Sequence, residues 1–124
     1  MKLLWIGLAG GLGSCARALL SGWAVDAFGT SLPFGTLTVN AIGSFLIGLL
    51  MQVFFNTQLI SPALCAVLAV GFLGGFTTYS SFNYETLVYI QNGDFVKAAL
   101  SFFTMSVVCL LAGALGIWVV KGLI

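Results

Sequence analysis

Residues 71–82 read Gly-Phe-Leu-Gly-Gly-Phe-Thr-Thr-Tyr-Ser-Ser-Phe, and they lie in the middle of a long apolar run. A glycine pair followed by two threonines and two serines is a poor continuous membrane helix. Broken helices occur at membrane depth where protein or a cavity satisfies the freed backbone groups. Such a break offers carbonyl oxygens to cations and N–H groups to anions. The stretch therefore predicts a membrane helix broken near its centre, and the alternative is a kink without function.

The composition around this stretch restricts the class of protein. The chain has 124 residues, of which 60% are hydrophobic and only 6% are charged, against roughly 25% charged residues in a soluble domain. No charged residue lies between Asp26 and Glu85. This excludes a soluble enzyme, a nucleic-acid binder and a disordered tail, and leaves a small integral membrane protein. Histidine is absent, and Cys15, Cys65 and Cys109 lie in apolar stretches, which predicts small buried side chains.

The chain divides into four apolar segments of the length that crosses a bilayer. They cover about residues 3–25, 33–55, 62–89 and 95–120. The connections are short, so we expect an all-α integral membrane protein that forms a single four-helix transmembrane domain over residues 1–124. The segments lack the alternating pattern of a membrane β-barrel. An even number of spans places both termini on the same side of the membrane.

The basic residues give almost no orientation signal. Lys2 and Lys121 lie on the side of the termini, and Lys97, with Arg17 if it is counted, lies on the other side. The excess of lysine and arginine on one side normally decides which way a chain inserts. Two interpretations remain open: a weak bias still settles one topology, or the chain inserts both ways and pairs with itself in antiparallel fashion.

Glycines cluster within the spans. The chain has 16 of them, and Gly7 with Gly11, like Gly71 with Gly75, are four residues apart. Such spacing of small residues lets membrane helices approach closely. Packing accounts for most of these glycines, although not for the polar residues that accompany them.

A polar stripe runs along the second span. Four of its residues recur at intervals of four and share one helical face: Thr36, Asn40, Ser44 and Gly48. The stripe predicts either hydrogen bonds between helices or one wall of a polar path. In the third span, Glu85 follows the broken stretch, and its carboxylate near a span end can simply reach the interface.

Three stretches together resemble the Fluc (CrcB-type) fluoride channel family. The first is Gly-Gly-Leu-Gly-Ser-Cys-Ala-Arg at residues 10–17, and the second is Gly-Thr-Leu-Thr-Val-Asn-Ala-Ile-Gly-Ser-Phe at residues 35–45. The third is Gly-Gly-Phe-Thr-Thr-Tyr-Ser-Ser-Phe at residues 74–82, with Glu85 after it. The resemblance covers essentially the whole chain, in order, including its length and its number of spans.

The resemblance implies an antiparallel dual-topology homodimer in a bacterial inner membrane, crossed several times by each chain. It implies two parallel pathways that conduct fluoride passively and selectively, and thereby export it from the cytoplasm. It also implies a structural Na⁺ at the centre of the dimer, held by the backbone carbonyls of Gly74 and Thr77. The implied partners are thus the fluoride ion, a second copy of the chain and the lipid bilayer.

The resemblance also assigns pore positions. The family's pore asparagine falls on Asn40, its vestibule arginine on Arg17, and its two pore phenylalanines on Tyr79 and Phe82. The tyrosine departs from the usual phenylalanine and can offer a ring edge or a hydroxyl. The remaining predicted pore residues all carry hydroxyl groups: Thr38, Ser80 and Ser81.

Two other classes of function compete with a channel. A proton-coupled exporter of the four-helix dual-topology type needs a carboxylate deep in a span, and Glu85 is the one candidate. A non-transporting assembly subunit explains the glycines but not the broken third span. The chemistry of fluoride favours the channel, because amide and hydroxyl donors and the positive edges of aromatic rings can replace the water around this small anion.

Overall fold

The computed structural model describes residues 1–124 and contains four long helical segments. They are α1 (Lys2–Phe28), α2 (Phe34–Asn56), a third segment from Pro62 to Gln91, and α6 (Phe95–Leu123). All four are long and apolar enough to cross a membrane. The four predicted spans are therefore confirmed, and their ends differ from the prediction by three residues at most.

Local capping explains where the segments begin and end. The Ser61 side chain accepts a hydrogen bond from the Leu64 N–H, and Pro62 occupies the first helical position. Asp94 caps α6 in the same way by accepting from the Lys97 N–H at 3.2 Å. Gly29 ends α1 in the left-handed region, with φ at 88°.

The third segment consists of several short helices. These are α3 (Pro62–Ala66), the π-helix η1 (Val67–Leu73), α4 (Gly74–Phe76) and α5 (Tyr79–Gln91). The predicted break near the centre is confirmed, and it lies at Thr77 and Thr78, whose backbones are extended. Gly74 keeps helical angles, φ −62° and ψ −39°, so the glycine pair is not itself the break.

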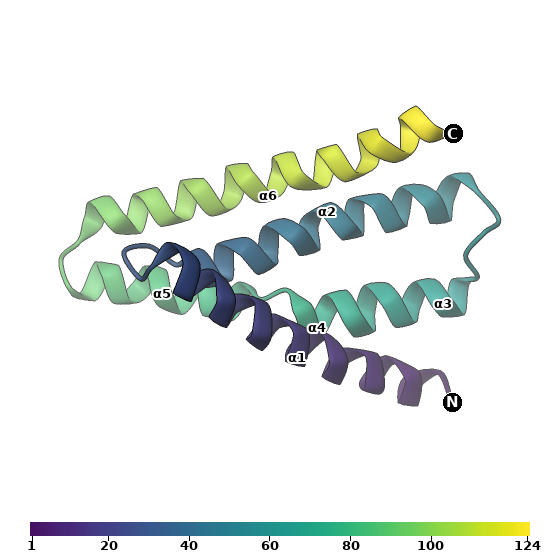
Figure 1. The fold of residues 1–124 in the computed structure, drawn as a ribbon, viewed down its shortest axis with the longest axis horizontal. Helices are drawn as coiled ribbons and strands as arrows, with labels where there is room; N and C mark the ends of the chain where they lie inside the picture. Colours follow the sequence, from purple (N-terminus) through teal and green to yellow (C-terminus); the bar gives the residue numbers. More distant parts are fainter.

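Figure 1 shows how the segments are arranged. Helix α6 runs along α2, while α1 crosses η1 and α4. The two termini lie at the same end of the molecule as the connection between α2 and α3. Helix α5 lies towards the opposite end, where it contacts α6. The break lies near the middle of the molecule, where α1 and α2 contact it.

Glycines permit close contacts between the helices. A Cβ on Gly75 would collide with the Gly10 carbonyl, which shows how closely α4 approaches α1. A Cβ on Gly116 would collide with the Phe45 carbonyl where α6 packs on α2. The sequence predicts that another helix approaches closely at Gly7 and Gly11. Within the single chain this prediction is wrong, because nothing lies within 4 Å of an added Cβ at either position. The α1 glycines in contact are on the neighbouring helical face.

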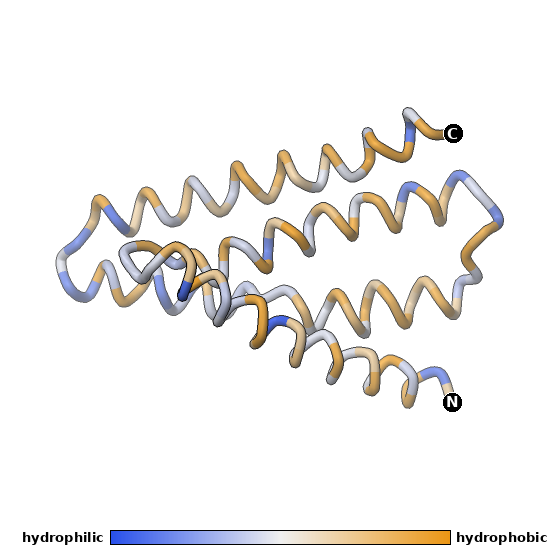
Figure 2. Tube along the Cα trace, viewed as in Figure 1, coloured by the Kyte–Doolittle hydropathy of each residue, from blue (hydrophilic) through white to orange (hydrophobic).

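The outer surface is apolar. Figure 2 shows hydrophobic residues along most of each helix, with polar residues concentrated at the connections. Large side chains on the outside include Leu19, 77% exposed, and Trp118, 76% exposed, as expected of a surface that faces lipid. The prediction that all three cysteines are buried is wrong for Cys15, which is exposed; Cys65 is buried and Cys109 is half-buried. Cys15 lies on the face of α1 that no other helix covers.

Candidate functional site

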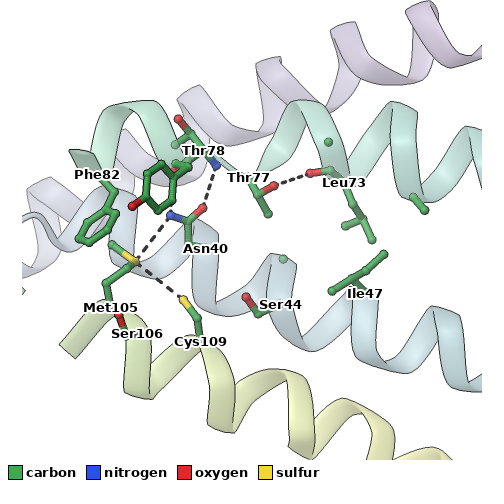
Figure 3. Close-up of a pocket in the computed structure, with 14 residues that line it drawn as sticks. Asn40, Ser44, Ile47, Leu73, Thr77, Thr78, Phe82, Met105, Ser106 and Cys109 are labelled. Atoms are coloured by element: carbon green, nitrogen blue, oxygen red, sulfur yellow. Dashed lines mark hydrogen bonds between the residues drawn. The ribbon is translucent and has the colours of Figure 1, made fainter. Parts of the chain in front are cut away.

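A cavity of about 420 Å³ lies beside the break, between the third segment, α2 and α6 (Figure 3). None of the residues that line it is charged. They come from three helical segments: Asn40, Gly43, Ser44 and Ile47 of α2, Met105, Ser106 and Cys109 of α6, and Ala69, Leu73, Gly74, Thr77, Thr78, Tyr79 and Phe82 of the third segment. The cavity therefore presents amide, hydroxyl, sulfur and aromatic groups.

Asn40 is joined to the break by two hydrogen bonds. Its Oδ1 accepts from the Thr78 N–H at 2.8 Å, and its Nδ2 donates to the Thr78 carbonyl at 2.9 Å. The side-chain amide thus takes the place of the helical partners that Thr78 lacks in its extended conformation. A buried backbone without such partners is costly. The polar residue on α2 consequently stabilises the broken conformation of the third segment.

Helix α1 satisfies two further carbonyls of this region. Arg17 donates from Nη1 to the Thr77 carbonyl at 3.3 Å, and Ser14 donates from its hydroxyl to the Gly75 carbonyl at 3.4 Å. Arg17 therefore lies against the backbone of the break and is not part of the cavity wall. Its predicted place at a pore mouth stays a prediction.

Tyr79 and Phe82, which the family resemblance assigns to the pore, both line the cavity. Their rings meet edge to face, with centroids 5.4 Å apart and an interplanar angle of 78°. Phe82 is 4% exposed, whereas Tyr79 is 71% exposed. The edge of an aromatic ring is electropositive, so the pair can present hydrogen edges to an anion. Phe82 also contacts Phe102 of α6, with centroids 6.1 Å apart.

The first turn of α5 carries a cluster of hydroxyl groups. The Thr78 Oγ1 accepts from the Ser81 N–H at 3.2 Å and lies 3.1 Å from the Ser81 Oγ and 3.3 Å from the Ser80 Oγ. The N-terminus of a helix carries a partial positive charge, and here it adjoins the cavity at Tyr79. Ser80 and Ser81 are exposed and lie outside the cavity wall, as does the half-buried Thr38.

The residues of the polar stripe on α2 differ in what they contact. Asn40 and Ser44 line the cavity. Thr36 instead donates a 2.7 Å hydrogen bond to Oε1 of Glu85 on α5, which leaves Oε2 buried without a hydrogen-bond partner. Gly48 permits close approach to Gly113 of α6. The ends of the stripe therefore join helices, and its middle forms a wall.

The residues of α6 in the cavity wall were not predicted from the sequence. Met105 and Cys109 line the cavity, and the Cys109 thiol lies 3.8 Å from the Met105 sulfur. The signal was a second set of small, hydroxyl or sulfur residues at intervals of four: Ser101, Met105, Cys109 and Gly113. This stripe mirrors the one on α2, and the two helices pack together.

The amino-acid sequence matches a known family. The sequence profile described as "CrcB-like protein, Camphor Resistance (CrcB)" matches residues 4–117. The chain belongs to the CrcB/FluC fluoride channel family. A protein of Sorangium cellulosum named "Fluoride-specific ion channel FluC" is 48% identical over 99% of this chain and 97% of its own length. Proteins of the same name from Geobacter metallireducens, 44% identical over 99% of both chains, and Geotalea daltonii, 44% identical over 93% of both chains, are also similar.

Membership of the CrcB/FluC family places the chain among ion channels and not among enzymes. It also agrees with the multi-pass membrane architecture of the four segments. The similarity to these relatives extends over nearly the whole length of both chains. The break, α1 and both polar stripes therefore all lie within the part of the sequence over which this chain is similar to these relatives.

Proposed function

We propose that this protein is a passive, fluoride-selective channel, and that the cavity beside the break is part of its pathway. The observation that carries the proposal is a cavity wall of uncharged donors and ring edges, with Asn40, Tyr79 and Phe82 together. Conduction requires binding that is strong enough to admit an ion and weak enough to release it. A wall without a fixed charge suits that requirement, and the names of the relatives supply the identity of the ion.

Fluoride is small and strongly hydrated, so the pathway must replace its water with close donors. The wall offers the amide of Asn40 and the hydroxyl of Ser44. The hydroxyls of Thr78 and Ser106 also line it, and they would have to turn away from the Ser81 hydroxyl and the Phe102 carbonyl to reach the ion. The positive end of α5 adds a favourable potential nearby. Where the wall has no hydroxyl group, the ring edges of Phe82 and Tyr79 take the place of the water around the fluoride ion. Selectivity then follows from the size of the anion and the reach of these donors.

The physiological role that we propose is export of fluoride from a bacterial cytoplasm across the inner membrane. Hydrogen fluoride crosses bilayers and ionises inside the cell, where the anion is trapped. A passive pathway for the anion relieves this accumulation without coupling to another ion. No carboxylate lies on the cavity wall, which supports passive conduction over exchange with protons.

The functional unit that we propose is an antiparallel homodimer with two pathways. Gly74 and Tyr79 line the cavity and are nevertheless exposed on the single chain. One chain thus leaves the cavity open on that side, and a second copy can close it. Lys2 and Lys121 lie on one side, against Lys97 and, if it is counted, Arg17 on the other, so the orientation signal is weak, which supports insertion in both directions.

A structural Na⁺ between the two chains is part of the proposal. The break fits a cation in one respect, because Gly74 is exposed and its neighbourhood has carbonyl oxygens and no carboxylate. The Thr77 carbonyl already accepts from Arg17 at 3.3 Å, and a carbonyl oxygen retains a second lone pair for another partner. The carbonyls of Gly74 and Thr77 from each chain would hold the ion, which would bridge the two chains at the break.

Fluoride efflux from liposomes containing the purified protein tests the proposal, with an ion-selective electrode as the readout. We expect rapid efflux in the absence of a proton gradient once a potassium ionophore balances the charge. Protein-free liposomes and chloride-loaded liposomes are the controls. Proton movement driven by an organic cation would instead indicate an exporter. If neither fluoride efflux nor proton movement is detected, and the protein is intact on size-exclusion chromatography, the result would indicate a non-transporting assembly subunit.

A further inference from the structure

Asn40 has only one N–H left for an anion. Its Oδ1 faces the Thr78 N–H, which fixes the orientation of the amide, because the opposite orientation would bring two donors together. One of the two Nδ2 hydrogens is taken by the Thr78 carbonyl at 2.9 Å. Nδ2 also lies 3.6 Å from the Met105 sulfur. The remaining N–H is therefore the one that points to Met105, on the cavity side of the amide (Figure 3).

The acceptor at this position is unusually weak. A thioether sulfur is a poor hydrogen-bond acceptor compared with an amide, a hydroxyl or a carboxylate oxygen. Met105 is 5% exposed, and its sulfur also lies 3.8 Å from the Cys109 thiol. The side chain is thus held in place among Asn40, Cys109 and the cavity. A hard anion such as fluoride competes easily with this neutral, soft partner.

We propose that Met105 tunes the fluoride affinity of the Asn40 N–H by occupying it with a weak acceptor that the ion displaces. This inference rests on the proposed function. In the empty cavity the sulfur occupies this N–H, whose direction the two hydrogen bonds to Thr78 already set. When fluoride arrives, the N–H exchanges sulfur for the anion, and it returns to sulfur when the ion moves on. Met105 is a positioning residue in this scheme, since it acts on the ion through Asn40.

Two substitutions with opposite expected effects test the proposal. Met105→Leu keeps the length and apolarity of the side chain and removes the acceptor, so the N–H is free and fluoride should bind more tightly. Met105→Gln has a similar length and supplies a strong amide acceptor, so fluoride should bind more weakly. We expect the fluoride concentration at half-maximal current to fall about threefold or more in the first variant and to rise about threefold or more in the second.

The measurement is single-channel current in planar bilayers as a function of fluoride concentration, with Na⁺ held constant. Met51→Gln is the matched control, because Met51 also contacts a cysteine thiol, with 3.9 Å between the Met51 and Cys65 sulfurs, and lies outside the cavity wall. It should leave the half-saturating concentration unchanged. Size-exclusion chromatography confirms equal amounts of folded protein.

A purely structural role for Met105 predicts a loss of current in both variants without opposite shifts of the half-saturating concentration. Shifts in the same direction, or no shift in either variant, would overturn the proposal. If Met105→Gln does not fold, the fall predicted for Met105→Leu alone still decides the question. A wild-type protein that conducts no fluoride would contradict the proposed function instead, and so the two failures are distinguishable.

Discussion

Asn40 shows how much a single side chain determines in this molecule. The same amide pairs with both backbone groups of Thr78 and forms part of the cavity wall. Asn40, which we propose as a ligand for the ion, thus also stabilises the extended backbone of the break. Substitutions at this position should therefore change the shape of the cavity as well as its chemistry.

Replacing Asn40 by Asp should reduce both fluoride flux and stability. The substitution exchanges the Nδ2 donor for an oxygen and brings it against the Thr78 carbonyl, which normally accepts at 2.9 Å. We expect a loss of about 2 kcal/mol or more in folding free energy and at least about a tenfold loss of flux. Thermal unfolding in detergent and liposome efflux measure the two effects. Asn56→Asp is the control, because the Asn56 side chain bonds only to the Gln52 carbonyl at the exposed end of α2.

The aromatic pair gives a second prediction for single residues. Phe82→Ile keeps an apolar side chain in this buried position but removes the positive ring edge, and should slow fluoride efflux at least about tenfold. Tyr79→Phe keeps the ring and removes the hydroxyl of a residue that is 71% exposed, and its effect should be mild. Efflux is compared at equal amounts of folded protein. Wild-type rates in Phe82→Ile would show that the pathway runs elsewhere.

At the scale of the helices, the third segment owes its shape to its neighbours. Asn40 of α2 and Ser14 and Arg17 of α1 satisfy backbone groups in and around the break. The glycines at these contacts allow the backbones to come close enough for short side chains to reach. The break is consequently held by contacts between helices and not by its local sequence alone.

The close packing of α6 on α2 can be tested by adding a single methyl group. Gly116→Ala places a methyl group against the Phe45 carbonyl and the Leu49 N–H, so the two helices must separate. We expect a loss of about 1–3 kcal/mol of folding free energy, seen as a lower unfolding temperature in detergent. The same change at Gly122, where nothing lies within 4 Å, should be neutral. Equal unfolding temperatures for the two variants would contradict this close packing.

At the scale of the whole molecule, the balance of charges makes orientation adjustable. Asn56→Lys and Gln58→Lys, at the end of α2 and in the connection that follows it, should hold that end in the cytoplasm. Lysines at Gln91 and Asn92 should hold the opposite end there. If the active form is an antiparallel dimer, each variant is inactive when expressed alone, and co-expression restores fluoride efflux. Full activity of either variant alone would contradict the antiparallel dimer.

The proposed Na⁺ makes a further prediction for the assembly. Exchange of Na⁺ for a much larger organic cation should reduce fluoride flux and lower the unfolding temperature of the dimer, since the carbonyls of Gly74 and Thr77 would lose their partner. Restoring Na⁺ should reverse both effects. Undiminished flux and stability after verified removal of Na⁺ would argue against a structural ion.

Several features of the protein follow from the sequence alone. The apolar runs and the scarcity of charge require four helices that can cross a membrane, because no soluble surface can be built from them. The threonines and serines after Gly74 and Gly75 predict a broken third helix. The spacing of four on α2 brings Asn40 and Ser44 to one face. Each of these properties depends on composition or on short-range periodicity.

The tertiary structure decided the rest. The break lies at Thr77 and Thr78 because helices on either side supply the missing hydrogen-bond partners, and no local pattern specifies where such partners will be. Gly7 and Gly11 are spaced like contact residues but have no neighbour, because α1 turns a different face to the third segment. Met105 enters the site only because α6 packs on α2 at this register. Contacts between residues far apart in the chain depend on helix rotation and register, which a periodic pattern leaves open.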